Sequence, residues 1–403
     1  MRPFRSIIPL DEARRRLAAG VRAVERTERV PLADAAGRVA VDDVTSSIDV
    51  PPFARSAMDG YAVVAADTEG ASPSTPVALH IVDRIYTGQP SSVAVTLGRC
   101  AEIATGAPLP TGADAVVMVE DTARLGDDRV HVLAAARPGQ NIGRRAADIA
   151  AGSHVVRAGN LLSPGRVGAL AAIGCRDVLV YAKPRVVVLS TGNEVIEPGQ
   201  PLAPGQIYDV NRFTVAAIVA AHGGVPEPQR AAEDSIDALG RVLDRAADAD
   251  LIVFSGGSSV GERDLSIDAI AGRGDVIFHG IAVRPGKPTL FARLEHAAFF
   301  GMPGNPTSCL MNAYVLLVPF LRATARLPPY NPRTVRAPLA RAIASAAGRH
   351  QFYAVQVRDG LAHPAFKGSG DITSLSEADG FIEIPADQSA VPEGTLVHVT
   401  LFG

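Results

Sequence analysis

The chain has 403 residues, of which 47% are hydrophobic and 20% charged, and its net charge is −3. A chain of this length and composition can bury sizeable hydrophobic cores. At about 100–200 residues per domain, we expect two to four domains. The acidic balance and the low aromatic content, 5% without tryptophan, argue against nucleic acid as a partner, because phosphate backbones attract basic surfaces and single strands need aromatic stacking.

The three cysteines, Cys100, Cys175 and Cys309, are odd in number and far apart. They form no CxxC pair, so a zinc site based on paired thiolates is excluded and a disulfide framework is disfavoured. We find no secretory signal, and the longest apolar run, residues 313–321, is much shorter than the roughly 20 residues of a membrane span. The sequence therefore predicts a soluble, cytoplasmic protein that does not bind a membrane.

The first half of the chain is predicted to be rich in short strands. A short helix is expected over residues 9–20. From about residue 44 to 148, β-branched runs alternate with Gly, Pro and Asp-rich turns, a pattern typical of β-domains. The expected strands cover residues 77–82, 93–96, 115–119 and 129–133. Ser163 and Pro164 then open a helix that ends near Gly174, since a hydroxyl N-cap followed by proline favours a helix start.

The second half changes to an α/β pattern. Strands are expected over residues 185–190, 251–254, 276–278 and 297–300, and helices over residues 213–222, 235–247 and 307–321. Alternating strands and helices indicate a parallel sheet with helices on both faces. After a proline-rich linker at residues 328–332, short strands return over residues 352–357, 380–385 and 395–401, which predicts a small C-terminal β-domain.

Three glycine-rich turns follow expected parallel strands, at residues 190–194, 255–264 and 301–308. Ligands of open α/β sheets bind beyond the carboxyl ends of the strands, so these turns are candidates for one site. Glycines let backbone N–H groups approach an anion, hydroxyls add donors, and Arg284 and Lys287 add charge. Any single turn is more simply explained as a tight turn. Three turns at one edge with two cations favour an anion site.

Two carboxylates accompany these turns, Glu194 and Asp264. Mg²⁺ prefers one or two carboxylates together with ligand phosphates, so both residues are candidate metal ligands. Helix capping is the alternative. It applies more to Asp264, and most to the Glu233-Asp234 pair that precedes the helix expected over residues 235–247. Asn305 and Pro306 have the residue types of an N-cap and a first helical residue, which would leave N–H groups free for an anion.

Other catalytic chemistries lack support. None of the nine histidines has the spacing of a zinc motif. The run at residues 256–261 lacks the G-x-S-x-G order of a hydrolase nucleophile, and no Walker A sequence is present. Histidine-bound zinc, a serine nucleophile and a P-loop are therefore disfavoured.

A series of motifs extends through nearly the whole chain, including Ser56-Ala-Met-Asp-Gly-Tyr61, Ser190-Thr-Gly-Asn-Glu194 and Pro303-Gly-Asn-Pro306. The full set covers residues 51–62, 105–117, 139–142, 190–194, 205–211, 255–264, 285–288 and 303–306. In this order and spacing the motifs resemble the MoeA-type molybdopterin molybdenumtransferases, the family that includes the C-terminal domain of gephyrin.

The resemblance implies a multidomain α/β plus β architecture in an elongated protomer. The implied domains are a discontinuous N-terminal domain (1–45 and 149–182), an inserted β-rich domain (46–148), a three-layer, molybdopterin-binding α/β domain similar to the molybdopterin adenylyltransferases (183–328) and a C-terminal β-barrel (329–403). It also implies a homodimer whose active site joins the α/β domain of one subunit to the β-rich domain of the other. A molybdopterin adenylyltransferase and molybdoenzymes are the further partners it suggests.

The implied reaction takes adenylylated molybdopterin (molybdopterin-AMP) and molybdate and yields molybdenum cofactor and AMP, with Mg²⁺ or another divalent cation. Backbone N–H groups, Lys287 and Arg284 can hold the anions. Carboxylates can hold a metal that offsets charge on the departing AMP. Positioning and electrostatics can then drive anhydride cleavage without a covalent protein intermediate.

The resemblance also implies the site residues. Asp59, Glu194, Asp264 and Lys287 would be catalytic, with Glu194 and Asp264 as metal ligands and Asp59 supplied by the partner subunit. The residues implied to bind the pterin nucleotide or the oxyanion are Thr105, Arg144, Arg145, Asp148, Thr191, Gly192, Asp234, Ser255, Gly256, Gly257, Ser259, Arg284, Pro303, Gly304, Asn305 and Pro306. Either arginine of the Arg144–Arg145 pair could contact the anion.

The chain departs from the family pattern at three places. Ala54 stands where Asp is frequent, Ala146-Ala147 replaces Gly-Glu, and Glu233 stands where Asp is usual, so Glu233 is an alternative to its neighbour Asp234. Two other functions remain alternatives: adenylyl transfer, which would need only the α/β part, and a non-catalytic cofactor carrier or scaffold, which would not need the acids. Tungstate is an alternative to molybdate, because the two oxyanions have nearly the same size and charge.

Overall fold

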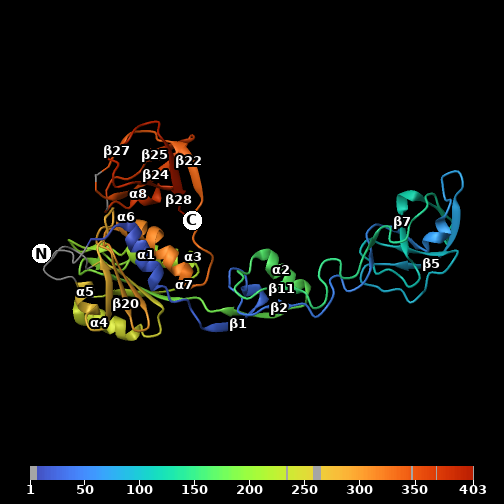
Figure 1. Ribbon diagram of the computed structural model, residues 1–403, viewed down its shortest axis with the longest axis horizontal. Coiled ribbons are helices and arrows are strands. Elements are labelled where there is room, and N and C mark those ends of the chain that lie inside the picture. Colours follow the sequence, from blue (N-terminus) through green and yellow to red (C-terminus); the bar gives the residue numbers. More distant parts are fainter. Residues whose placement is uncertain (1–6, 233–234, 257–264, 346–347, 369, 403) are drawn as a thin grey trace. The chain divides into compact units, whose positions relative to one another are not determined.

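Figure 1 shows the computed structural model, which describes residues 7–232, 235–256, 265–345, 348–368 and 370–402. The chain divides into two compact units. The α/β unit comprises the chain up to Glu28, Gly37–Val39 and Val180–Gly403, and the β-rich unit comprises Arg29–Ala36 and Ala40–Leu179. The chain passes from one unit to the other within the strands β1 (Thr27–Pro31) and β12 (Asp177–Tyr181). Within the described residues, no helix has the length and apolar character needed to cross a membrane.

The centre of the α/β unit is a six-stranded sheet in the order β16-β13-β17-β21-β20-β18. Its strands are β13 (Arg185–Thr191), β16 (Val225–Ala232), β17 (Leu251–Ser255), β18 (Gly274–His279), β20 (Leu290–Leu294) and β21 (Ala298–Met302). The first four strands in this order are parallel, but β20 and β18 are antiparallel to their neighbours, which corrects the expectation of a parallel sheet. The reason is the short turn between β20 and β21, closed by a 2.9 Å bond from Leu294 N–H to the Ala297 carbonyl. Parallel neighbours would need a crossover of about a dozen residues.

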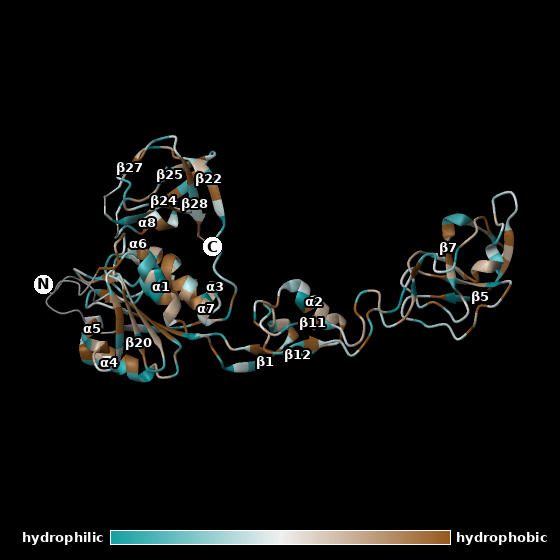
Figure 2. Ribbon diagram, in the orientation of Figure 1, coloured by the Kyte–Doolittle hydropathy of each residue, from teal (hydrophilic) through white to brown (hydrophobic). Residues whose placement is uncertain are grey.

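Helices cover both faces of this sheet, as the sequence predicts (Figure 1). On one face lie α1 (Leu10–Gly20), α3 (Asn211–Ala221), α6 (Pro306–Asn312) and α7 (Val318–Thr324), with the π-helical turn Ala313–Leu317 joining the last two, and on the other face lie α4 (Ile236–Arg245) and α5 (Leu265–Ile270). Val186 and Val188 pack on the first side, whereas Val187 and Leu189 pack on the second. Burial on both faces explains why β13 contains a continuous apolar run over residues 186–189. Figure 2 shows brown, hydrophobic segments in this sheet near the label of β20.

A second sheet in the same unit confirms the C-terminal β-domain. Its order is β19-β24-β26-β28-β22, and β25 pairs with β24. The strands are β19 (Val283–Arg284), β22 (Thr334–Pro338), β24 (His350–Arg358), β25 (Leu361–Pro364), β26 (Gly380–Ile384) and β28 (Leu396–Leu401), beside the pair β23 (Ile343–Ala344) and β27 (Ala390–Val391) and the short helix α8 (Thr373–Ser376). Its closure into a barrel stays a prediction. The strand β19 comes from the α/β part of the chain. It joins this sheet because Val283 pairs with His350 of β24.

The β-rich unit contains a six-stranded sheet in the order β7-β4-β6-β5-β9-β8. Its strands are β4 (Gly60–Val63), β5 (Val77–Ile85), β6 (Arg99–Ile103), β7 (Ala115–Met118), β8 (Thr122–Leu125) and β9 (Arg129–Val132). Smaller elements are the pairs β2 (Val44–Thr45) with β11 (His154–Val156) and β3 (Arg55–Ser56) with β10 (Ile142–Gly143), and the helix α2 (Pro164–Ala172), which Ser163 caps at Arg166 N–H. The strand expected over residues 93–96 is wrong: the segment is irregular and Val95 N–H bonds to the Thr111 carbonyl of a loop.

Candidate functional site

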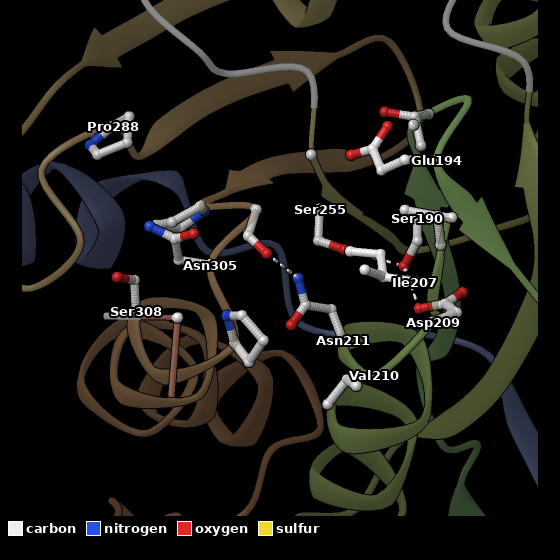
Figure 3. Close-up of a pocket in the computed structure, with 18 of the residues that line it drawn as sticks. Ser190, Glu194, Ile207, Asp209, Val210, Asn211, Ser255, Pro288, Asn305 and Ser308 are labelled. Carbon is white, nitrogen blue, oxygen red and sulfur yellow. Dashed lines mark hydrogen bonds between the residues drawn. The ribbon is translucent and has the colours of Figure 1, made fainter. Parts of the chain in front are cut away.

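The carboxyl ends of β13, β17 and β21 lie side by side. In parallel register, Ser190 pairs with Ser255, and Ser255 pairs with Met302. The turns that follow these strands therefore meet at one edge of the sheet, as their sequence pattern predicts. A cavity of about 1630 Å³ opens at this edge (Figure 3), larger than the roughly 300–1,000 Å³ of typical ligand pockets.

Many of the predicted site residues line this cavity. They are Thr191, Gly192, Glu194, Ser255, Gly256, Arg284, Lys287, Pro303, Gly304, Asn305 and Pro306. Asp234, Gly257, Ser259 and Asp264 lie outside the described residues, as does Glu233. Of the two predicted metal ligands, Glu194 is therefore the one that the structure describes.

Glu194 is held at the rim of the cavity by the turn before it. Val195 N–H bonds to the Gly192 carbonyl at 2.9 Å, and Ile207 N–H bonds to the Glu194 carbonyl at 2.8 Å, which joins β14 (Val195–Ile196) to β15 (Ile207–Tyr208). Gly192 has a φ of +142°, and a Cβ there would lie 2.7 Å from Glu194 Oε2. Glycine thus permits both the backbone conformation and the close approach of the exposed carboxylate.

A buried polar network lies below this edge. Asp209 is 4% exposed, and its Oδ1 accepts hydrogen bonds from Ser190 Oγ at 2.8 Å and from Arg212 N–H at 3.1 Å. Arg212 Nε lies 3.1 Å from Asp209 Oδ2, and Arg212 Nη2 lies 2.6 Å from Glu197. Opposite charges therefore compensate the buried carboxylate. Ser190 Oγ is also 3.0 Å from Ser255 Oγ.

Among the residues that the structure describes, four basic side chains line the cavity: Arg284, Lys287, Arg349 and Lys367. Arg349 and Lys367 were not among the site residues predicted from the sequence. The pairing of β19 with β24 carries Arg349 to the loop that begins at Arg284, and no local pattern indicates a contact over this separation. The chain has only three lysines, and two of them line this cavity. This concentration of positive charge suits an anionic ligand.

The loop at residues 284–288 is fixed from beneath by Asn312, a fully buried residue of α6. Asn312 Nδ2 donates to the Gly286 carbonyl at 2.9 Å and to Thr289 Oγ1 at 2.6 Å. Gly286 has a φ of +103°, and a Cβ there would lie 2.3 Å from Asn312 Nδ2. Only glycine fits this contact, so the backbone that carries Lys287 has a defined conformation.

The remaining predicted residues gather in the β-rich unit. Thr105 N–H donates to Asp59 Oδ1 at 2.7 Å. Gly106 N–H bonds to the Ser56 carbonyl at 2.8 Å, and Ala57 N–H bonds to the Asn141 carbonyl at 2.8 Å. Three motifs of the first half of the chain, residues 51–62, 105–117 and 139–142, therefore meet at one place.

The two arginines after these motifs differ in their contacts. Arg145 Nε lies 2.5 Å from Asp49 Oδ2. The Ala151 backbone N–H and the Arg145 guanidinium hold the pKa of Asp49 below its usual value. Arg144 and Asp148 are exposed, and Arg144 forms no ion pair within the described part of the chain. The two candidate arginines therefore differ in that Arg145 has a carboxylate partner and Arg144 has none in the described part of the chain.

A metal ion would find few ligands from this chain in the described residues, which contain no group of three or more His, Cys, Asp and Glu side chains suited to one ion. Asp209 is already engaged by Arg212 and Ser190. Glu194, an exposed carboxylate in the cavity wall, is compatible with Mg²⁺, because Mg²⁺ takes one or two carboxylates and completes its shell with ligand phosphates and water.

The fold and the cavity define an α/β protein whose site, at the carboxyl edge of its sheet, suits an anionic ligand. Residues 8–174 match the MoeA N-terminal region (domain I and II), residues 187–323 a probable molybdopterin binding domain, and residues 336–402 the MoeA C-terminal region (domain IV). The chain belongs to the MoeA family of molybdopterin molybdenumtransferases.

Individual relatives match over almost the whole chain. Molybdopterin molybdenumtransferase 2 of Mycobacterium tuberculosis is 38% identical, over 92% of this chain and 94% of its own length. The molybdopterin molybdenumtransferase of Haemophilus influenzae is 32% identical, over 98% of this chain and 99% of its own. The crystal structure of the molybdopterin biosynthesis MoeA protein from Pyrococcus horikoshii superposes with a TM-score of 0.85 at 38% identity, covering 99% of this chain and 100% of that one.

Proposed function

We propose that this chain is a molybdopterin molybdenumtransferase, which inserts molybdate into adenylylated molybdopterin and releases AMP. The observation that carries the proposal is the cavity at the carboxyl edge of β13, β17 and β21, which combines four basic side chains with the carboxylate of Glu194. Both substrates are anionic, and their charge matches this lining. Family membership over the whole chain supports the same reaction.

The residues of the cavity have separable roles in this proposal. Lys287, Arg284 and Arg349 bind the oxyanion and the phosphate groups, and Asn312 positions the loop that carries Lys287. Glu194, together with Asp264, would hold Mg²⁺, which when bound offsets the charge that develops on departing AMP. The protein contributes electrostatic stabilisation and alignment of the reacting groups rather than a covalent intermediate.

The residues of the β-rich unit complete the proposed site. We propose that the protein acts as a homodimer, in which Asp59, Thr105, Arg144 and Asp148 of one subunit serve the cavity of the other. Asp59 is oriented for such a role by the Thr105 N–H, which leaves the second carboxylate oxygen for the substrate. The exposed charge of Arg144, rather than the paired charge of Arg145, would contact the anion.

The test is release of AMP from adenylylated molybdopterin by the full chain with Mg²⁺, in the presence and absence of molybdate. We expect release that depends on molybdate, with tungstate as a parallel oxyanion. A protein that binds the adenylylated pterin but releases no AMP with either oxyanion would be a carrier, and the proposal would fail. Formation of adenylylated molybdopterin from ATP would instead show adenylyl transfer.

A further inference from the structure

A chain of three hydrogen-bonded polar groups lies in the wall of the cavity. It joins the carboxylate of Asp209 to Ser190 Oγ at 2.8 Å, and Ser190 Oγ to Ser255 Oγ at 3.0 Å (Figure 3). All three residues are at least 96% buried, and all three line the cavity. Ser190 and Ser255 occupy paired positions on β13 and β17, so the backbone register places the two side chains next to each other.

The direction of the protons in this chain follows from chemistry. An ionised carboxylate only accepts hydrogen bonds, and a hydroxyl has one proton to donate. Ser190 therefore gives its proton to Asp209, which faces the Arg212 guanidinium. The short contact between the serines must then use the proton of Ser255. The Ser255 hydroxyl then has only its lone pairs left, so it can accept a hydrogen bond from a ligand.

We propose that Ser255 is a hydrogen-bond acceptor in the site, set in this role by Asp209 through Ser190, and that it selects a neutral O–H or N–H donor of the substrate. On this proposal Ser255 would be an exception to the expectation that the hydroxyls of these turns add donors for an anion. The inference rests on the proposed function, because the pterin nucleotide supplies such donors in its ribose hydroxyls and in the N–H groups of its pterin.

The arrangement of the cavity agrees with this division of roles. Glu194, which also only accepts while ionised, lies on the same side as Ser190 in Figure 3, whereas Pro288 at the end of the cationic loop lies on the opposite side. An oxyanion close to Ser255 would meet lone pairs and be repelled. The phosphate and molybdate groups therefore belong near the loop at residues 284–288, and the neutral donors belong at the end of β17.

The experiment measures binding of separate probes by calorimetry to the wild type, Ser255→Ala and Ser190→Ala. The probes are AMP, 2′-deoxy-AMP, 3′-deoxy-AMP, unconjugated pterin and molybdate. Losing one neutral hydrogen bond weakens binding by about 2- to 12-fold. We expect Ser255→Ala to weaken either AMP or the pterin by this factor and to leave molybdate unchanged. If a ribose hydroxyl is the donor, the deoxy analogue that lacks this hydroxyl will bind Ser255→Ala and the wild type equally. If the pterin is the donor, AMP and both deoxy analogues will bind Ser255→Ala and the wild type equally.

Ser190→Ala removes the acceptor for the Ser255 proton and frees that proton for the ligand. We expect weaker binding of the same donor-bearing probe and unchanged or tighter binding of molybdate. Ser255→Thr, which keeps a hydroxyl, should restore the affinity that Ser255→Ala loses. Where a variant does not fold, comparison of the deoxy analogues and the pterin on the wild type and the remaining variant answers the same question.

Two results would overturn the inference. One is a loss of molybdate affinity in Ser255→Ala with AMP and pterin unchanged, which would make Ser255 an anion donor. The other is no change for any probe in Ser255→Ala. Because these are binding measurements, they are separate from the AMP release assay, so a failure of the proposed reaction is distinguishable from a failure of the role of Ser255.

Discussion

The backbone N–H of Thr105 donates a 2.7 Å hydrogen bond to the carboxylate of Asp59, 46 residues earlier in the chain. The bond connects two motifs that the sequence analysis identified separately. The bond engages one carboxylate oxygen of Asp59 and thereby orients the side chain.

Asp59→Asn removes the charge of this side chain but keeps its hydrogen bond with Thr105. The amide oxygen still accepts from Thr105 N–H, so we expect an unfolding temperature close to that of the wild type. Loss of the charge should slow AMP release by at least about tenfold, equivalent to roughly 1.4 kcal/mol of barrier. Asp67→Asn is the matched control, because Asp67 accepts a similar 2.7 Å bond from Gly98 N–H in the same unit. Equal rates for the two variants would remove Asp59 from the site.

Glu194→Gln tests the carboxylate at the rim of the cavity. The change keeps the shape of the side chain but weakens any divalent-cation site, so we expect AMP release to require a higher Mg²⁺ concentration for half-maximal rate. The control is Glu295→Gln in the turn before β21, at the opposite edge of the sheet. A Mg²⁺ dependence identical to that of the wild type would exclude Glu194 as a metal ligand.

Gly286 and Asn312 should be energetically coupled. Gly286→Ala places a Cβ 2.3 Å from Asn312 Nδ2 on a backbone with positive φ, and Asn312→Ala leaves the Gly286 carbonyl with one donor fewer, so each should lower the free energy of unfolding by about 1–3 kcal/mol. The double variant should lose less than the sum, because removing Asn312 makes room for the methyl group. Denaturant titrations of the four proteins measure the coupling, and strict additivity would contradict it.

The cysteines should differ in reactivity. Burial raises the pKa of Cys100 and of Cys309 to about 12, with smaller contributions from Glu102 and Asp209. At pH 8 only about one molecule in 10⁴ then carries either thiolate. We expect alkylation of the native protein to modify the partly exposed Cys175 first, and all three residues to react in denaturant. Mass spectrometry locates the adducts, and early modification of Cys309 would contradict the packing of α6.

The ion pair of Asp49 with Arg145 should make stability depend on pH. Because the pKa of Asp49 is lower in the folded protein, the carboxylate stabilises the fold above its unfolded pKa of about 3.9. This contribution is lost as the pH falls through the folded value. The difference in unfolding temperature between wild type and Asp49→Asn should be present at neutral pH and vanish in strong acid. If the difference in unfolding temperature persists unchanged in acid, the charge of Asp49 is not its cause.

Local sequence patterns predicted most of the α/β sheet. The runs that became β13, β17 and β21 are buried on both faces and read as continuous apolar segments. The strand β16 was missed because Pro226 and Pro228 disfavour a strand, yet β16 lies at the edge of the sheet, where proline is tolerated.

The site was predictable where its residues follow strands in the sequence. Arg349 and Lys367 could not be found in this way, because they reach the cavity through the C-terminal sheet and its pairing with β19. The role of Asp209 likewise depends on its burial against Arg212 and Ser190, which the motif at residues 205–211 does not reveal.

In the proposed function, oxyanion insertion and AMP release are one reaction on this chain. A single turnover of protein-bound adenylylated molybdopterin with molybdate and Mg²⁺ tests it most directly, with AMP and pterin-bound molybdenum both quantified. We expect one molybdenum inserted for each AMP released, and neither product without the other. AMP released in full without molybdate, or without molybdenum bound to the pterin, would contradict it.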